Sequence, residues 1–380
     1  MRVAQLQFKF GESPDLVKLA ALQALSPQLL LVFASPAFFA APEAAGLLAS
    51  AFPDAVRVGC STAGEIPRAG IDDDTCVLTA VRFDASTVRE AVTPLADMAD
   101  SHAAGIRLGQ ALQGEQLAAV LMFGQGVAIN GSALAAGVVE VLGPQVPVTG
   151  GLAGDGTAFQ RTWVLSSSGP SNDQVVAVGL YGDRLEVGHG SFGGWEPFGP
   201  LRQVTRCDHN LLFELDGQPA LEVYRRYLGE YADTLPASAL LFPLQIIHAN
   251  GEPGPIRTIL GIDEAAGSLI LAGDVPPDGA MKLMHSNADA LVEGASVAAG
   301  KARDMLQSKQ AQLGLLVSCV GRKLVMGDLT DDEIDAVAES FNPDAVLTGF
   351  YSYGELCPAL AGVPCQLHNQ TMTVTFLREE

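Results

Sequence analysis

One short sequence motif occurs three times in this chain, each time after an apolar run. The copies read VGCSTAGE (58–65), VTGGLAGD (148–155) and TGFYSYGE (348–355). In an alignment of the three copies, a glycine is followed by an acidic residue: Gly64–Glu65, Gly154–Asp155 and Gly354–Glu355. A unit repeated at this scale is one supersecondary block that cannot bury its apolar face alone. The chain is therefore expected to consist of related blocks that pack together.

The sequence around each copy follows one order of elements. An apolar run and a segment of helical pattern precede each copy, and a strand-like run follows it. The apolar runs are 29–35, 117–123 and 313–318, and the strand-like runs are 77–83, 175–181 and 372–377. Alternation of strands and helices predicts an α/β fold with mixed sheets and hairpins. One hairpin is expected at 161–181, where a Ser/Gly/Pro/Asn turn separates two strand patterns.

These blocks suggest a layered sandwich of two domains. Blocks 1–95 and 96–190 form an amino-terminal domain, 1–200, and a third block, 313–380, closes a carboxy-terminal domain, 201–380. The boundary is placed where the pattern changes to short alternating runs. A long helix is predicted from about residue 287 to about residue 311.

Composition excludes several classes of protein. Hydrophobic residues make up 48% of the chain and charged residues 17%, which predicts a large core. The longest apolar stretch, 29–41, is interrupted by Ser35 and Pro36 and is shorter than the roughly 18 residues of a membrane span. A net charge of −21 repels nucleic acid and anionic membranes. The amino terminus does not resemble a signal peptide, so we expect a cytoplasmic protein.

The repeated turn has a structural and a functional interpretation. Glycine permits a tight connection, and the acidic side chain can accept hydrogen bonds from nearby backbone N–H groups. The third copy differs, because Tyr351 and Tyr353 stand where the others have small residues. With Glu355 they offer apolar faces, hydroxyls and a charge, as a ligand pocket requires. Further candidate ligand-binding residues come from the other copies: Cys60, Ser61 and Asp155.

Other catalytic and cofactor motifs are incomplete. GCSTAG (59–64) has Ala63 where a hydrolase nucleophile elbow needs glycine. GGLAGDG (150–156) matches neither a phosphate-binding loop nor a dinucleotide fingerprint. Two of the six histidines are candidate axial ligands for a haem iron. His189 lies in a Gly-rich segment beside Trp195, and His368 precedes the last strand.

At these motifs the chain resembles the FIST-domain proteins. The resemblance rests on segments in the family's order along nearly the whole chain: GCSTAGEI (59–66), GGLAGDG (150–156), GGWEPFGP (193–200), LFELDGQPALEVY (212–224), LLFPL (240–244) and GFYSYGEL (349–356). It implies FIST N and FIST C parts and a non-enzymatic, intracellular sensory module. Such modules recognise a small molecule, which for some members is proposed to be an amino acid or a similar metabolite.

One branch of that family, the nitric-oxide-sensing NosP proteins, implies a haem cofactor. NosP proteins signal through histidine kinases or cyclic-di-GMP enzymes, so the resemblance implies a separate partner of that kind. They carry a histidine just before the equivalent of Trp195, where this chain has Gly193 and Gly194. His189 is near enough in sequence to take its place, with His368 or Cys357 as the next candidates.

Three hypotheses follow for the function. The first is a metabolite sensor in which Glu355 holds an ammonium or hydroxyl group of the ligand and the two tyrosines cover its apolar part. The second is a haem-based nitric oxide sensor with His189 as axial ligand. The third, which we expect least, is an enzyme with Cys60 or Ser61 as nucleophile and Glu65 or a distant histidine as base.

Overall fold

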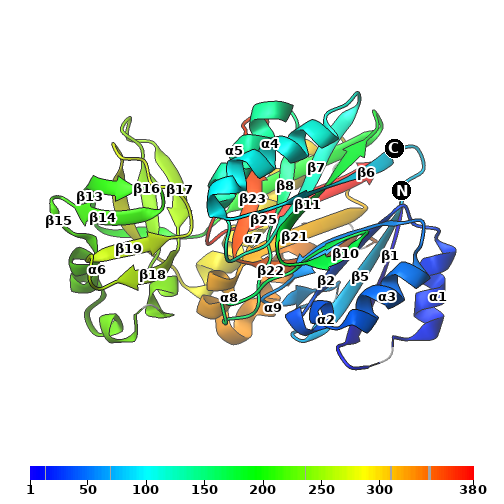
Figure 1. Ribbon diagram of the computed structural model, residues 1–380, viewed down its shortest axis with the longest axis horizontal. Coiled ribbons are helices and arrows are strands. Elements are labelled where there is room, and N and C mark those ends of the chain that lie inside the picture. Colours follow the sequence, from blue (N-terminus) through cyan, green and yellow to red (C-terminus); the bar gives the residue numbers. More distant parts are fainter. Residues whose placement is uncertain (13, 69, 236, 309, 341–343) are drawn as a thin grey trace.

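The computed structural model describes residues 1–380 except 13, 69, 236, 309 and 341–343, and for 42, 44, 45 and 237 it describes the backbone alone. Two bodies are visible in Figure 1: a larger one that contains both chain ends and a smaller one on the left of the view. We call the larger, residues 1–192 and 286–380, the three-block body. The smaller, residues 196–285, is called the small lobe.

The first sheet of the three-block body has the order β1-β5-β2-β3-β9-β10. Strands β2 and β3 are parallel, and β5 runs antiparallel beside β2. The strands of this sheet and the helices that connect them are β1 (Arg2–Lys9), α1 (Leu16–Ala24), β2 (Leu29–Ala34), α2 (Pro36–Ala40), α3 (Pro42–Ala51), β3 (Val56–Ser61), β5 (Thr75–Arg82), β9 (Val164–Ser166) and β10 (Gly169–Ser171). Every residue of β2 is buried, as expected for an apolar strand covered on both faces.

The second sheet repeats this plan in the order β24-β23-β8-β7-β11-β6. Strands β7 and β8 are parallel, and β11 is antiparallel to β7. Its elements are β6 (Thr87–Pro94), η1 (Met98–Asp100), α4 (Ser101–Leu112), β7 (Leu117–Gly124), α5 (Gly131–Leu142), β8 (Val148–Leu152), β11 (Gln174–Tyr181), β23 (Gly354–Pro358) and β24 (Cys365–His368). Helix α5 begins where the Asn130 side chain accepts a hydrogen bond from the backbone N–H of Ala133, at 3.0 Å.

The third sheet has the order β12-β25-β21-β22-β4. Its parallel pair is β21 and β22, and β25 is antiparallel to β21. Its elements are β4 (Glu65–Ile66), β12 (Leu185–Phe192), α7 (Ala288–Met305), β21 (Leu313–Cys319), α8 (Val320–Met326), η4 (Gly327–Leu329), α9 (Thr330–Ala338), β22 (Val346–Ser352) and β25 (Met372–Glu379). The predicted α/β fold with mixed sheets is therefore confirmed.

The blocks are linked by a cyclic exchange of strands. The strand after each motif pairs in the sheet of another block: β4 with β22, β9 with β3, and β23 with β8. The motifs themselves are hydrogen-bonded in the same cycle, from Ala63 N to Tyr351 O at 2.8 Å, Gly154 N to Ser61 O at 2.9 Å, and Tyr353 N to Leu152 O at 3.1 Å. The three turns therefore meet at the centre of the body, as expected for a duplicated structure with pseudo-threefold symmetry.

This exchange corrects the predicted hairpin at 161–181. The turn residues join β9 to the short strand β10, with which it pairs, whereas β11 lies in the second sheet between β7 and β6. The local turn pattern could not reveal that β9 is donated to another block. The long helix was also predicted too far, since α7 ends at Met305.

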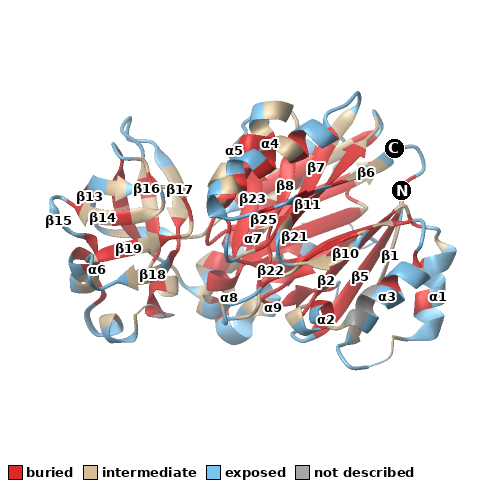
Figure 2. Cartoon of the chain, in the orientation of Figure 1, coloured by how far each residue is buried: buried red, intermediate tan, exposed pale blue. Residues whose placement is uncertain are grey.

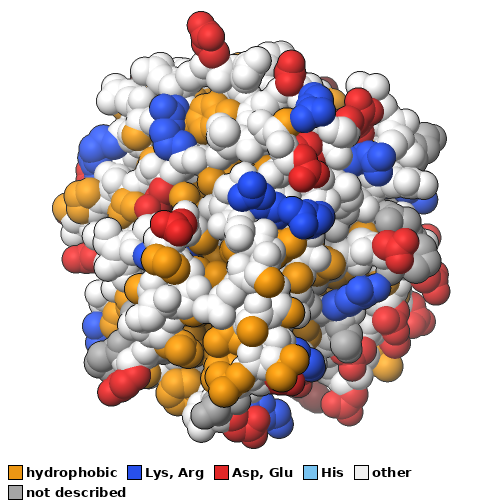
Figure 3. Space-filling view, turned by 90° about the vertical axis from the view of Figure 1, so that its right-hand side faces the viewer, with side chains coloured by type: hydrophobic (Ala, Val, Ile, Leu, Met, Phe, Trp, Pro, Cys, Tyr) orange, Lys and Arg blue, Asp and Glu red, His pale blue; other side chains and the backbone are white. Residues whose placement is uncertain are grey.

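The cores lie between these sheets and their helices, and burial is greatest on the central strands in Figure 2. The end of the body with α1 and α3 exposes apolar side chains between scattered charges (Figure 3). On α1, Leu16 and Val17 are 73% and 80% exposed. Within the described residues, no helix combines the length and the apolar character that crossing a bilayer requires.

The small lobe has its own apolar core, which includes Leu212, Tyr224 and Leu269. Its elements are β13 (Glu196–Asp208), β14 (Leu211–Leu215), β15 (Gln218–Pro219), α6 (Ala220–Leu228), η2 (Gly229–Thr234), η3 (Ala237–Leu241), β16 (Leu244–Ile247), β17 (Pro253–Arg257), β18 (Ile259–Asp263), β19 (Ser268–Leu271) and β20 (Ala280–His285). The lobe is inserted between β12 and α7, so the three-block body draws elements from both predicted domains, 1–200 and 201–380.

Candidate functional site

Glu65 of the first motif is a buried carboxyl group bonded by neighbouring threonines. Its Oε1 accepts a hydrogen bond from the Thr62 hydroxyl, and its Oε2 accepts from the backbone N and the hydroxyl of Thr75, both at 2.9 Å. Its side chain points away from solvent, with an exposed fraction of 1%. This arrangement closes the loop between the motif and β5.

Glu355 of the third motif repeats the arrangement. Its Oε1 accepts a hydrogen bond from Ser352 Oγ at 2.6 Å, and its Oε2 accepts from the backbone N and hydroxyl of Thr371, at 3.2 and 2.9 Å. It is fully buried. The structure therefore gives Glu355 protein partners on both oxygens, where the sequence suggested a ligand's ammonium or hydroxyl group.

The two buried carboxyl groups should make the stability of the protein depend on pH. Burial raises the pKa of Glu65 and of Glu355 to about 7, against hydrogen bonds that lower it. The folded pKa exceeds the unfolded one, so the native state binds more protons, and the stability that these two groups contribute is fully present below about pH 4.5 and is lost as the pH rises through about 7. Over that range we expect the contribution of each group to the free energy of unfolding to fall by about 1–3 kcal/mol.

Glu355→Gln tests this, because glutamine accepts hydrogen bonds and does not ionise. Urea unfolding at several pH values should give a flatter profile for this variant than for the wild type. Glu12→Gln, which changes an exposed residue, is the matched control and should keep the wild-type profile. An equally steep profile in Glu355→Gln would contradict the assignment.

Asp155 of the second motif departs from this pattern. It is half-buried, and its carboxylate accepts hydrogen bonds from three successive backbone N–H groups, those of Phe159, Gln160 and Arg161, at 2.9, 2.9 and 2.8 Å. The Tyr353 hydroxyl donates to the same carboxylate. The loop 155–161 is therefore fixed to the third motif. This is the point at which the pseudo-symmetry of the three carboxyl groups breaks.

Phe159 and Tyr353 form one wall of this region. Their rings are stacked with centroids 4.2 Å apart and an interplanar angle of 13°. Tyr353 is 7% exposed, so Phe159 covers most of it from the solvent side. Of the two tyrosines suggested by the sequence, Tyr353 is the one at a cavity.

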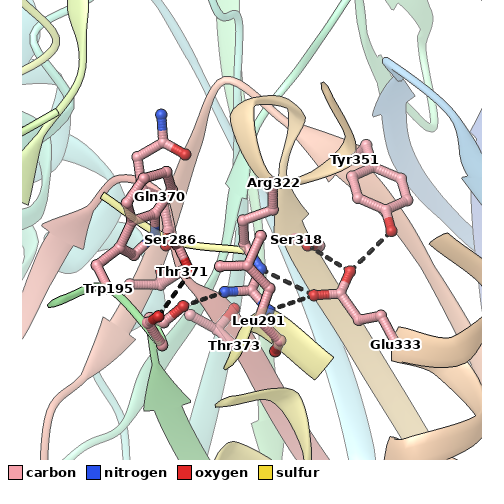
Figure 4. A network of polar contacts seen from close by, with 12 residues as sticks. Trp195, Ser286, Leu291, Ser318, Arg322, Glu333, Tyr351, Gln370, Thr371 and Thr373 are labelled. Atoms are coloured by element: carbon pink, nitrogen blue, oxygen red, sulfur yellow. Dashed lines mark hydrogen bonds and ion pairs between the residues drawn. The ribbon is translucent and has the colours of Figure 1, made fainter. Parts of the chain in front are cut away.

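Tyr351 belongs to a buried polar network instead (Figure 4). Its hydroxyl donates to Glu333 Oε2 at 2.7 Å, and Ser318 Oγ donates to the same oxygen at 2.9 Å. The other carboxylate oxygen of Glu333 pairs with Arg322, and both ionised side chains are fully buried. Through Tyr351, the network holds the third motif in the interior of the body.

Cys60 and Ser61 are also internal. Burial raises the pKa of the Cys60 thiol well above its usual value, and the side chain has no exposed surface. Ser61 Oγ donates to Gly154 O at 2.7 Å and accepts from Trp163 N at 2.9 Å. These contacts join two motifs. They give neither side chain the base or the access that a nucleophile needs.

Two neighbouring cavities lie between the three-block body and the small lobe. The larger, of about 700 Å³, is called the apolar cavity and is lined by Thr157, Phe159, Tyr231, Thr234, Leu235, Ser238, Leu240, Leu241, Ile259, Leu260 and Leu324. A second, of about 210 Å³, shares Phe159 and Leu260 with it and reaches Tyr353. Residues from both bodies therefore enclose one cleft, and loop 155–161 forms part of its wall.

Two family models together cover most of this chain. The FIST N domain model matches residues 28–218, and the FIST C domain model matches residues 220–358. The chain belongs to the FIST family. FIST domains are sensory domains implicated in signal transduction. The resemblance to FIST-domain proteins drawn from the sequence segments is thereby confirmed.

One curated protein and one solved structure are similar to parts or all of this FIST protein. An uncharacterized protein of Methanocaldococcus jannaschii is 31% identical over 100 residues, which cover 25% of this chain and 19% of that protein. The crystal structure of a cyanuric acid hydrolase from A. caulinodans aligns over 99% of both chains, with 10% identity and a TM-score of 0.37. At that TM-score the likeness carries no functional argument.

The surroundings of His189 and His368 do not fit a haem. His189 lines a cavity of about 220 Å³, below the roughly 300–1,000 Å³ that small-molecule and cofactor sites occupy. His368 is buried with its Nε2 2.9 Å from Cys357 O, and burial lowers its pKa to about 4. Among the described residues, no cluster of three or more His, Cys, Asp or Glu side chains could hold a metal ion.

Sequence reasoning missed the residues that shape the cleft. Phe159 lies four residues after Asp155, a spacing at which the carboxylate caps the loop and directs the ring, but such capping has no reliable sequence pattern. Leu260 and the η3 residues come from the small lobe, whose position beside the motifs depends on the tertiary fold. Arg322 and Glu333 are separated by a helix end, so their pairing also required the structure.

Proposed function

We propose that this FIST protein is a cytoplasmic sensory module that binds a small metabolite, an amino acid or a similar compound, in the cleft between its two bodies. The apolar cavity is the observation that carries the proposal. Its volume of about 700 Å³ lies within the usual range for small-molecule sites. The signal would pass to a separate protein, for which a histidine kinase or a cyclic-di-GMP enzyme is the candidate.

The position of the cavity supports a sensory role. Phe159 and Leu324 come from the three-block body, whereas Tyr231, Ser238 and Leu260 come from the small lobe. A ligand there contacts both bodies at once, so its binding energy depends on how they are arranged. Ligands shift conformational equilibria only through such differential contacts.

The predicted site residues then take different roles in the proposal. Tyr353 and Asp155 hold Phe159 and loop 155–161 at the cavity wall. Glu355, Tyr351, Cys60 and Ser61 hold the motifs behind that wall through buried contacts. The second group would affect ligand binding through the position of the wall rather than by touching the ligand.

Leu260→Trp is expected to abolish ligand-induced stabilisation. Leu260 lines both cavities and is 45% exposed, so a larger ring can occupy the cleft with little folding cost. The measurement is a thermal-shift screen of amino acids and small carboxylates against both proteins. A ligand at about 100 times its Kd should stabilise the wild type by about 2.7 kcal/mol.

Leu201→Trp is the matched control, because Leu201 is 47% exposed on β13 and lines neither cavity. It should respond to ligand as the wild type does. A metabolite that stabilises the wild type and Leu260→Trp equally would show that it binds elsewhere and would contradict the proposed cleft.

A further inference from the structure

The apolar cavity offers a ligand carbon surface and no charge. None of the described residues that line it is charged, and most of them are leucine, isoleucine or phenylalanine. Two of its hydroxyl groups are used within the small lobe, because Thr234 Oγ1 and Ser238 Oγ donate to Tyr231 O at 3.2 and 2.6 Å. A ligand in this cavity is therefore bound mainly through burial of its own apolar surface.

The second cavity, of about 210 Å³, continues this surface. It adjoins the apolar cavity at Phe159 and Leu260, and none of its described lining residues is charged. Its two side-chain amides are bonded within the protein. Asn130 Nδ2 donates to Asp274 Oδ1 at 3.0 Å, and Asn210 Nδ2 donates to a backbone oxygen of β19 at 2.9 Å. Across the described linings, the cleft thus provides no counter-ion for a charged ligand group.

The second cavity has room for one ring-sized apolar group. A cavity of roughly 150 Å³ lined by apolar side chains is large enough for a benzene molecule. The stacked rings of Phe159 and Tyr353, with centroids 4.2 Å apart, supply aromatic surface in its wall. Aromatic rings attract one another beyond the burial of their area. The second cavity therefore fits an aromatic ring or a branched alkyl group.

A charged ligand group would be poorly stabilised in this cleft. Moving a charge out of water costs free energy unless an opposite charge or new hydrogen bonds replace the water. The described linings contain no acidic or basic side chain. An anion is disfavoured further by the net charge of −21 on the chain. An uncharged ligand avoids both of these costs.

We propose that the cleft selects an uncharged ligand and that the second cavity holds its aromatic ring or branched alkyl group. This inference rests on the proposed function of the cleft. It narrows the ligand from amino acids in general to uncharged relatives of those with a large apolar side chain. Phe159 and Leu260 line both cavities and contact the ligand where its apolar group enters the second one, so they determine specificity.

The first test uses four probes that share the side chain of phenylalanine and differ in charge. They are N-acetyl-L-phenylalaninamide, which is neutral, L-phenylalaninamide, a cation, N-acetyl-L-phenylalanine, an anion, and L-phenylalanine, a zwitterion. Titration calorimetry at about pH 6 keeps the amino groups protonated and the carboxyl groups ionised. The neutral probe should bind at least about tenfold more tightly than each charged probe.

Leu260→Lys is expected to change this preference, because it places an ammonium group on the wall that the two cavities share. The affinity of the anionic probe relative to the neutral one should rise at least about tenfold. Leu201→Lys is the matched control, because it adds the same charge at a position that is 47% exposed and lines neither cavity. It should keep the wild-type ratio. An equal rise in both variants, or no rise in Leu260→Lys, would overturn selection by the cleft.

Methyl NMR locates the ring of the neutral probe. Intermolecular nuclear Overhauser effects should join its ring protons to the methyl groups of Ile129 and Leu152, which line the second cavity and not the apolar one. Effects to Leu240 and Leu241 alone, which line only the apolar cavity of the two, would show that the ring does not occupy the second cavity.

Leu260→Trp separates a failure of this proposal from a failure of the proposed function. A charged probe that binds more tightly than the neutral one, and loses its affinity in Leu260→Trp, overturns the uncharged class but leaves the cleft as the ligand site. A neutral probe that binds Leu260→Trp as tightly as the wild type contradicts both. If none of the four probes binds at millimolar concentration, the proposed ligand class is wrong.

Discussion

Arg322→Ala is expected to destabilise the protein by about 3–5 kcal/mol, the usual cost of leaving one ion of a buried pair uncompensated. Arg322 and Glu333 are both fully buried. The guanidinium donates through Nε to Glu333 Oε1 at 2.8 Å and through Nη2 to Leu291 O at 2.8 Å, and it also bonds Gly193 O. Its loss would leave the Glu333 carboxylate charged in the core.

The effect should extend to the third motif. Arg322 joins α8 to α7, α9 and the segment before Trp195, and Glu333 in turn bonds Tyr351 (Figure 4). Removing the guanidinium therefore removes the hydrogen bonds that join these three elements to α8. Urea unfolding monitored by circular dichroism measures the loss.

Two further variants distinguish the effect of the buried charge from a general loss of stability. Arg225→Ala removes one partner of an exposed ion pair, with Glu264, and should leave the melting temperature nearly unchanged. The double variant Arg322→Met, Glu333→Leu should recover part of the stability, because no uncompensated charge remains buried. If the double variant is less stable than Arg322→Ala, the buried charge is not the cause.

Gly349→Ala is expected to cost at least about 3 kcal/mol, near the upper end for overpacking. A Cβ atom on Gly349 would lie 1.8 Å from the carbonyl oxygen of Leu316 on the neighbouring parallel strand β21. The clash is with backbone, so no side-chain rotation relieves it. Gly59, at the equivalent place in the first block, has the same 1.8 Å approach to Val32 O.

A glycine-to-alanine substitution in α7 should have the opposite effect on stability. Gly300 lies within α7, and a Cβ atom there would have no heavy atom within 4 Å. Gly300→Ala should stabilise the protein by about 0.5–1 kcal/mol, because glycine in a helix interior costs more backbone entropy than alanine. Comparable melting temperatures for Gly349→Ala and Gly300→Ala would show that the strands separate easily at Gly349.

Local patterns were sufficient to predict the repeated plan. The apolar runs became the parallel and antiparallel centres of three sheets, because a strand covered on both faces must be apolar along its whole length. The strand-like run 372–377 falls within β25, and the run 175–181 falls within β11. Such features depend on residues close in sequence. The hairpin at 161–181 was wrong because β9 pairs with a strand about a hundred residues earlier.

The candidate site shows what the sequence could not give. Glu65, Asp155 and Glu355 follow equivalent glycines and are similar in sequence, yet two are bonded in the core and one fixes a loop at a cleft. Their different surroundings come from residues far along the chain, such as Tyr353 beside Asp155.

The sequence by itself therefore determined the family and the repeated α/β plan, since repetition and periodicity are local properties, whereas the meeting of the three turns required the structure. The tertiary structure alone decided which motif residues are accessible. It also placed the small lobe against loop 155–161. Burial, pairing and cavity shape arise from long-range contacts, and those are fixed only when the blocks and the lobe pack together.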